Sequence, residues 1–137
     1  MKLRIPVLIC AAGLLLPACG AETSADEMHY IKTTVLYDTL YDMYASPDGY
    51  LGKQFHMVGT LYPSTDDQDE TFYSLYTSDA DGGHGIGLEL DWSDYSGIED
   101  YDTITVEGRL DTEKGTSNGE KVEYLILRVS MLEKRAD

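Results

Sequence analysis

Residues 72–92, Phe-Tyr-Ser-Leu-Tyr-Thr-Ser-Asp-Ala-Asp-Gly-Gly-His-Gly-Ile-Gly-Leu-Glu-Leu-Asp-Trp, decide the fold, because apolar and polar residues alternate through their second half. This period of two is typical of a strand with one buried face. Residues 72–77 form a first arm, residues 79–84 a turn rich in Asp and Gly, and residues 85–92 a second arm. The stretch therefore predicts a β-hairpin. The apolar side chains of its second arm share one face, which we expect to point inward: Ile86, Leu88, Leu90 and Trp92.

Three further segments show the same alternation and predict three more strands. The inward rows are Phe55, Met57 and Leu61 in residues 53–62, Ile104, Val106 and Leu110 in the strand that begins near residue 103, and Leu125, Leu127, Val129 and Met131 in residues 121–132. Gly59 and Gly108 interrupt two of these rows, and Gly59 predicts a bulge or sharp bend in the first of them. We expect residues 63–70 to form an acidic turn and residues 112–120 a mobile hairpin loop. Residues 93–100 could hold one helical turn.

One amphipathic helix precedes the strands. Leu36, Leu40, Met43 and Tyr44 recur at helical spacing and predict a helix over residues 34–45, which Pro47 and Gly49 stop. Tyr37, Tyr41 and Tyr44 form a second stripe on it. This stripe suits either a stacking platform for a ring-shaped ligand or rings at the boundary between core and solvent.

The order of these elements predicts the fold class. One helix followed by five strands, with a short connection between the third and fourth, is the plan of a mainly β, five-stranded, OB-fold-like Greek-key barrel with an N-terminal helix. The alternative is an open meander packed under the helix.

The N-terminus predicts export and a lipid anchor. Residues 1–18 combine Lys2 and Arg4 with a short apolar run, which is typical of a signal peptide. Leu16-Pro17-Ala18-Cys19 resembles a bacterial lipobox and makes Cys19 the candidate lipidation site; an ordinary signal peptide with an incidental cysteine is the alternative. We expect a lipidated, flexible tether over residues 19–30 and an OB-fold-like domain over residues 31–137, outside the cytoplasmic membrane in the bacterial cell envelope.

Charge and cysteine content exclude several functions. Because Lys2 and Arg4 leave with the signal peptide and no acidic residue does, the formal net charge moves from -15 to -17. A chain this acidic is a poor partner for nucleic acid and favours a cationic or neutral partner. Cys10 would be removed and Cys19 acylated, so no disulfide, thiol nucleophile or cysteine zinc site is expected.

Short motifs resemble a family of uncharacterised bacterial OB-like domains. The motifs are Tyr50-Leu51-Gly52-Lys53, Val58-Gly59, Thr77-Ser78-Asp79-Ala80-Asp81 and Val106-Glu107-Gly108. They are similar to the soluble domain of the DUF1980 family, found beside predicted permeases, and to related Clostridial-type lipoproteins. Many members carry a Cys-Cys pair near the Asp-Ala pair, where this chain has Thr77 and Ser78. The resemblance implies a fold and an envelope location, and no settled activity.

Two groups of residues are candidate sites. Asp79, Asp81 and His84 bring two carboxylates and an imidazole into one turn and could contribute to a metal site, or could simply form the turn. Tyr62, Tyr73 and Tyr76 are the candidate ligand-binding face of the barrel, flanked by residues 63–70 and 112–120. No nucleophile elbow, phosphate loop or dinucleotide fingerprint is present, so we expect no enzymatic activity and no cofactor.

Two functions remain open from the sequence. The first is a non-enzymatic, lipid-anchored binding or interaction module that meets an envelope protein partner. The second is an accessory subunit of a metal-handling or permease system that binds a cation through Asp79, Asp81 and His84. The ligand, the oligomeric state and the type of cell envelope are left open.

Overall fold

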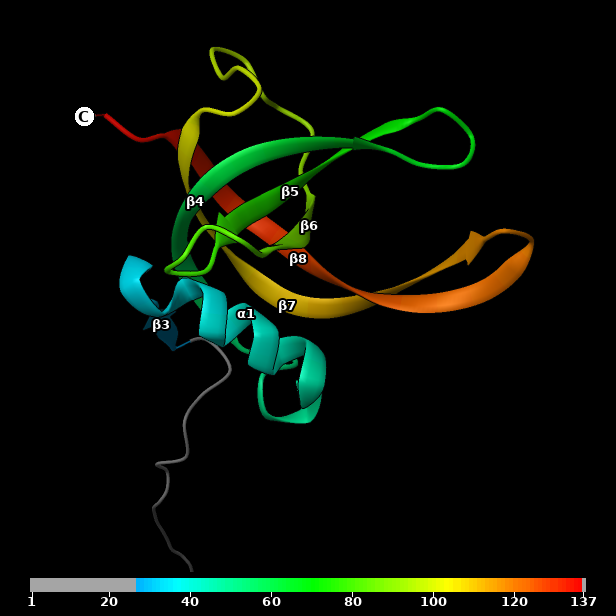
Figure 1. Ribbon diagram of the computed structural model, residues 1–137, viewed down its shortest axis with the longest axis horizontal. Coiled ribbons are helices and arrows are strands. Elements are labelled where there is room, and N and C mark those ends of the chain that lie inside the picture. Colours follow the sequence, from blue (N-terminus) through cyan, green and yellow to red (C-terminus); the bar gives the residue numbers. More distant parts are fainter. Residues whose placement is uncertain (1–26, 137) are drawn as a thin grey trace, which may run out of the picture.

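The computed structural model describes residues 27–136, so the predicted signal peptide, Cys19 and the first part of the tether lie outside the described residues. Figure 1 shows a strongly curved sheet with one helix beside it. The strands are β3 (Met28–Tyr30), β4 (Gln54–Thr65), β5 (Thr71–Ser78), β6 (Gly85–Asp91), β7 (Thr103–Ser117) and β8 (Glu120–Lys134). The helical elements are η2 (Thr33–Val35), α1 (Leu36–Ala45) and η3 (Pro47–Gly49).

Five of these strands close into a barrel. The neighbours run β4, β5, β6, β8, β7, and β7 pairs again with β4. All pairings in this ring are antiparallel except β6 with β8, which is parallel and covers only Glu89–Asp91 against Ile126–Arg128. This strand order is that of an OB-fold-like Greek-key barrel, so the predicted mainly β fold class with an N-terminal helix is confirmed and the open meander is wrong.

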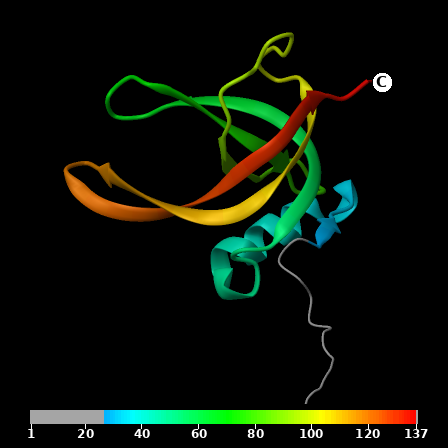
Figure 2. The same ribbon diagram turned by 180° about the vertical axis from the view of Figure 1, so that it is seen from behind.

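Strand β4 closes the barrel because it pairs with two different strands along its length. Residues Gln54–Thr60 pair with β7, residues Thr60–Thr65 pair with β5, and Thr60 is common to both ladders. Gly59 lies just before this change of partner, where a Cβ atom would stand 2.8 Å from Leu75 Cδ1 and 2.9 Å from the Tyr76 carbonyl oxygen. The predicted bend is therefore present, and Figure 2 shows the resulting arc of β4.

A bulge between β7 and β8 changes which residues face the core. Glu107 pairs with Met131 and Gly108 with Val129, so Ser130 is an extra residue in β8. The extra residue reverses the alternation beyond it. Leu132, and not Met131, packs against the core. The prediction that Met131 points inward is therefore wrong, because the sequence pattern carries no mark of the added residue.

The interior of the barrel is filled by aliphatic side chains. Leu36, Leu40 and Met43 of α1 are buried against them at the spacing that predicted the helix. The remaining members of this core include Phe55, Met57, Leu61, Leu75, Leu88, Leu90, Ile104, Val106, Leu110, Leu125 and Leu127. In the part of the chain that the structure describes, no helix is long and apolar enough to cross a membrane.

Several predicted boundaries are wrong. Residues 28–30, expected in the tether, form β3 and pair in parallel with Gln54–His56, so the ordered domain begins before residue 31. Residues 63–65 belong to β4, which shortens the acidic turn. Residues 93–100 contain no helical turn, and Trp92 lies beyond β6 with its indole N–H donated to the Asp94 carbonyl at 2.8 Å.

The predicted loop at residues 112–120 is also wrong. Strands β7 and β8 continue through it and are joined by Asn118 and Gly119, whose φ values of 53° and 83° suit a tight primed turn. The polar composition that suggested a loop reflects the exposure of this extension, in which no residue from 112 to 117 is fully buried. Figures 1 and 2 show the ends of the β4–β5 and β7–β8 hairpins projecting from the same side of the barrel.

Replacing Gly108 tests the bulge. A Cβ atom there would lie 2.5 Å from the Arg128 carbonyl oxygen and 2.9 Å from Val129 Cα, both of which are backbone atoms. We expect Gly108→Ala to lower the free energy of unfolding by about 2 kcal/mol or more, measured by urea titration. The control is Gly83→Ala, because nothing lies within 4 Å of the position that its added Cβ atom would take. Equal stability of the two variants would contradict the bulge geometry.

Candidate binding site

The three tyrosines of the predicted binding face lie on two sides of the sheet. Tyr62 and Tyr76 point outward from β4 and β5 and stack with their ring centroids 4.7 Å apart. Tyr73 lies three residues from Tyr76, so the strand period sends it to the opposite side. It packs against the core and against Tyr95, with ring centroids 4.6 Å apart. The structure therefore brings together two of the three predicted residues.

Burial raises the pKa of both Tyr73 and Tyr95. Burial, followed by the nearby Asp100 carboxylate, raises the pKa of Tyr73. Burial, followed by Tyr73 and the Asp91 and Glu89 carboxylates, raises the pKa of Tyr95 to about 12. Both phenols therefore stay neutral at physiological pH and support the wall of the barrel.

Sequence reasoning missed a third outward tyrosine, Tyr101. Its ring meets that of Tyr62 edge to face, with centroids 5.6 Å apart and planes at 88°. The residue adopts a left-handed φ of 72°, uncommon for a non-glycine residue. Its N–H donates to the Leu61 carbonyl at 2.8 Å, and the Leu61 N–H donates to the Asp102 carbonyl at 2.9 Å. The sequence shows only a polar loop here, because the contact with β4 joins residues about 40 positions apart.

The turn between β5 and β6 uses its polar groups internally. One oxygen of the Asp79 carboxylate accepts the N–H groups of Gly83 at 3.1 Å and His84 at 3.4 Å, and the other lies 3.1 Å from His84 Nδ1. Burial acts to raise the pKa of Asp79, but the hydrogen bonds from His84 and Gly83 outweigh it and lower the pKa. Within residues 27–136, no group of three or more His, Cys, Asp or Glu side chains is placed to hold a metal ion. The geometry thus gives Asp79 and His84 a role in the turn and does not gather Asp81 with them as a metal site.

A groove lies between the ends of the two projecting hairpins. It encloses about 500 Å³ and is lined by residues of the β4–β5 end, β6 and the β7–β8 hairpin: Thr65, Asp66, Asp67, Gln68, Phe72, Glu89, Gly115, Thr116, Ser117, Val122 and Tyr124. The Asn118 N–H donates to Asp67 Oδ2 at 3.2 Å and links the two hairpin ends. We call this feature the hairpin groove. The sequence could not show it, since Gly115, Thr116 and Ser117 of its wall lie in the segment predicted to be a mobile loop.

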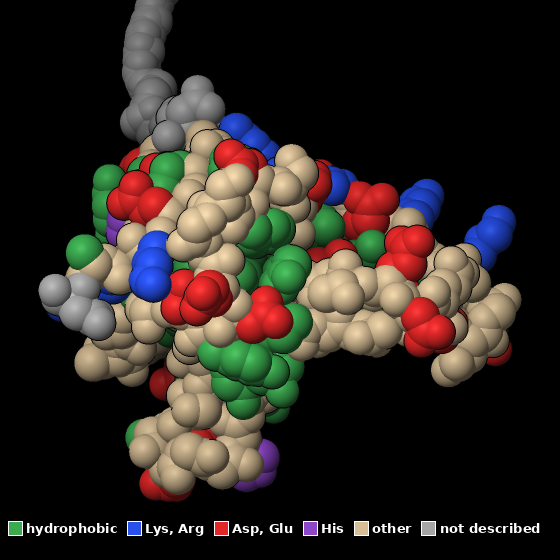
Figure 3. All heavy atoms as spheres, turned by 90° about the horizontal axis from the view of Figure 1, so that it is seen from above, with side chains coloured by type: hydrophobic (Ala, Val, Ile, Leu, Met, Phe, Trp, Pro, Cys, Tyr) green, Lys and Arg blue, Asp and Glu red, His purple; other side chains and the backbone are tan. Residues whose placement is uncertain are grey.

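Glu89 is one of three acidic residues that line the hairpin groove, with Asp66 and Asp67. Burial, followed by the Glu113, Asp66 and Asp91 carboxylates, raises the pKa of Glu89. Among the described residues, no side chain forms a hydrogen bond or ion pair with its carboxylate. Figure 3 shows one face of the molecule, where hydrophobic side chains gather with acidic side chains beside them.

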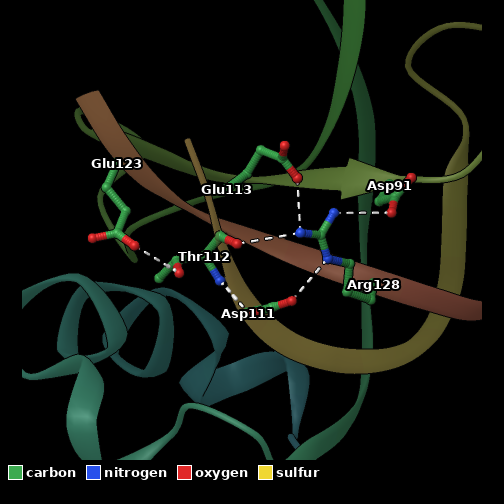
Figure 4. A network of polar contacts seen from close by, with 6 residues as sticks. All are labelled: Asp91, Asp111, Thr112, Glu113, Glu123 and Arg128. Carbon is green, nitrogen blue, oxygen red and sulfur yellow. Dashed lines mark hydrogen bonds and ion pairs between the residues drawn. The ribbon is translucent and has the colours of Figure 1, made fainter. Parts of the chain in front are cut away.

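Two of these neighbours, Glu113 and Asp91, are paired with one guanidinium, that of Arg128 (Figure 4). Arg128 contacts Asp91 at 3.1 Å, Asp111 at 3.0 Å and Glu113 at 2.7 Å, and donates to the Thr112 carbonyl at 3.2 Å. The hydrogen bonds that Arg128 donates to Asp111 and Glu113 raise the pKa of the guanidinium, and the first of them lowers the pKa of Asp111. The cluster joins β6, β7 and β8 and remains acidic, because three carboxylates surround one cation.

Comparisons with known proteins give no family. No protein-family model and no curated protein matches the chain, so the resemblance to the DUF1980 family stays a prediction. Among solved structures, the chain is similar to the small single-stranded DNA-binding protein from Streptomyces coelicolor, with 12% identity and a TM-score of 0.38 over 60% of this chain and 93% of that one. We base the fold assignment on the strand order.

Replacing Glu89 tests the charge of the hairpin groove. A carboxyl group whose pKa is higher in the folded than in the unfolded state reduces stability as pH rises from its unfolded to its folded pKa. We therefore expect Glu89→Gln to raise the free energy of unfolding at pH 7 by up to about 1 kcal/mol, and the gain to disappear as pH falls toward about 4. The measurement is urea unfolding as a function of pH.

The matched control is Glu120→Gln at the start of β8, which removes the same charge outside the hairpin groove. An equal gain in the free energy of unfolding in both variants would mean that the loss of net charge alone, and not the position of Glu89, causes it. A loss of stability in Glu89→Gln would contradict the unpartnered state of this carboxylate.

Proposed function

We propose that this chain is a non-enzymatic binding module, anchored by a lipid on Cys19 to the extracytoplasmic side of the bacterial cell envelope. The observation that carries the binding role is the hairpin groove, where the half-buried Glu89 has no side-chain partner among residues 27–136 and shares the lining with Phe72 and Tyr124. The barrel interior is filled by side chains, so a ligand would bind on the outside of the barrel. Concave surfaces that combine apolar rings with a few polar groups are typical ligand sites.

The charge of the chain supports a cationic or neutral ligand. The formal net charge is -15, and the hairpin groove itself contributes Asp66, Asp67 and Glu89. A phosphate backbone would meet repulsion there, because nucleic-acid affinity depends on Lys and Arg contacts to phosphate. We therefore do not propose that this chain binds nucleic acid. The accessory role through Asp79, Asp81 and His84 receives no support from the turn geometry and is not proposed.

Lipid attachment is tested by labelling. We expect the full chain, expressed in a bacterial host fed with a clickable fatty acid, to incorporate the label and fractionate with membranes. Cys19→Ser should lose both properties, because the thiol is the acceptor of the lipid. Cys10→Ser is the matched control and should keep both. A labelled Cys19→Ser variant would contradict the proposed anchor.

Ligand contact in the hairpin groove is tested by site-directed crosslinking in the native envelope. We expect the photoreactive residue benzoylphenylalanine at Tyr124 to form a discrete adduct when illuminated, since that ring lines the groove. The same residue at Tyr41, an exposed tyrosine on α1, is the control and should form none. Absence of an adduct at Tyr124, or the same adduct at both positions, would overturn the proposed binding role.

A further inference from the structure

Three tyrosines form a continuous aromatic surface beside the hairpin groove. Tyr76 stacks on Tyr62, and Tyr62 meets Tyr101 edge to face. Phe72, which lines the groove, and Tyr76 leave β5 on the same outward side, because they are separated by an even number of residues. We call Tyr62, Tyr76 and Tyr101 the tyrosine cluster. Its position means that one extended ligand could contact both surfaces.

The fold holds this cluster in place. Tyr101 is 63% exposed, yet its backbone is fixed in a left-handed conformation by the hydrogen bonds with Leu61. Such a conformation is strained for a residue with a side chain, so the surrounding hydrogen bonds must maintain it. Gly85 provides room for Tyr76, since a Cβ atom there would lie 1.9 Å from the Tyr76 hydroxyl oxygen. Rings held in this way bind with little further loss of conformational entropy.

Acidic residues outnumber basic ones around Tyr101. Glu99, Asp100 and Asp102 flank it in the sequence. The end of β8 adds Lys134, whose ammonium is paired with Asp102 Oδ2 at 3.4 Å, and Arg135, whose backbone N–H donates to the Thr103 carbonyl at 2.9 Å. A tyrosine ring carries negative potential on its face and attracts guanidinium and ammonium groups within about 6 Å of its centroid. Arginine suits this setting better than lysine, since its planar group stacks on rings and loses less hydration.

We propose that the tyrosine cluster receives an arginine side chain from a basic, extended segment of a protein partner. The inference rests on the proposed function, because the same segment would continue into the hairpin groove. Charge complementarity favours this occupant over a neutral saccharide, which would stack on the rings and gain nothing from the acidic field.

The test uses the full chain and a fluorescent hexa-arginine peptide amide as the probe, with binding followed by anisotropy at low ionic strength. The matched control peptide replaces each arginine by citrulline, which has nearly the same shape and no charge. We expect the arginine peptide to bind and the citrulline peptide to bind at least tenfold more weakly. Equal binding of the two peptides would overturn the proposal.

Substitutions at Tyr101 then test whether the peptide binds at the tyrosine cluster. We expect Tyr101→Leu to weaken binding by about threefold or more, the size of an exposed cation–π contact. Tyr101→Gly should do the same and keeps the fold testable, because glycine accepts the left-handed backbone. Tyr41→Leu is the control, since Tyr41 is 61% exposed and lies on α1. Unchanged affinity in both Tyr101 variants would overturn the assignment to the tyrosine cluster.

Two outcomes separate this inference from the proposed function. Binding that Glu89→Gln weakens and the Tyr101 variants leave unchanged would keep the hairpin groove and remove the tyrosine cluster. Binding of maltohexaose that depends on Tyr101, without binding of the arginine peptide, would replace arginine by a neutral saccharide as the occupant and overturn the proposal.

Discussion

The double pairing of β4 is the constraint on which the rest of the structure depends. One strand must form a ladder with β7 along its first half and with β5 along its second, and Thr60 takes part in both. The strand can satisfy both partners only by bending inward, and Gly59 lets it do so without a Cβ atom against Leu75. Once the barrel is closed, the inward side chains of its strands pack into one core, which they share with α1.

The opposite seam of the barrel is short and is reinforced by side chains. β6 and β8 share only three paired positions, and Arg128 on β8 reaches carboxylates on β6 and β7 beside them. Elsewhere on β6, the Tyr44 hydroxyl of α1 donates to the Gly87 carbonyl at 2.7 Å. The helix therefore covers part of this strand as well as the apolar end of the core. Burial, followed by Glu89, raises the pKa of Tyr44, which keeps this donor protonated.

Because the interior is filled, the binding surfaces that we propose lie on the outside of the closed barrel. The two hairpins extend beyond the ring of paired strands and form the walls of the hairpin groove, while the outward rows of β4 and β5 carry stacked tyrosines. Both surfaces lie beside acidic residues, which is why we propose a cationic or neutral ligand for them rather than a phosphate backbone. Fold alone would not make that distinction, since function depends on the groups placed on the fold.

The sequence by itself determined the five barrel strands, the helix and the bend at Gly59, because alternation and helical spacing are local properties of the chain. It also determined the acidic field. Only the tertiary structure decided that Ser130 is a bulge, that residues 112–117 extend β7, and that Tyr73 faces the core while Tyr101 joins Tyr62. These features depend on pairing between segments far apart in the chain, where one added residue or one long-range hydrogen bond reverses the direction of a side chain.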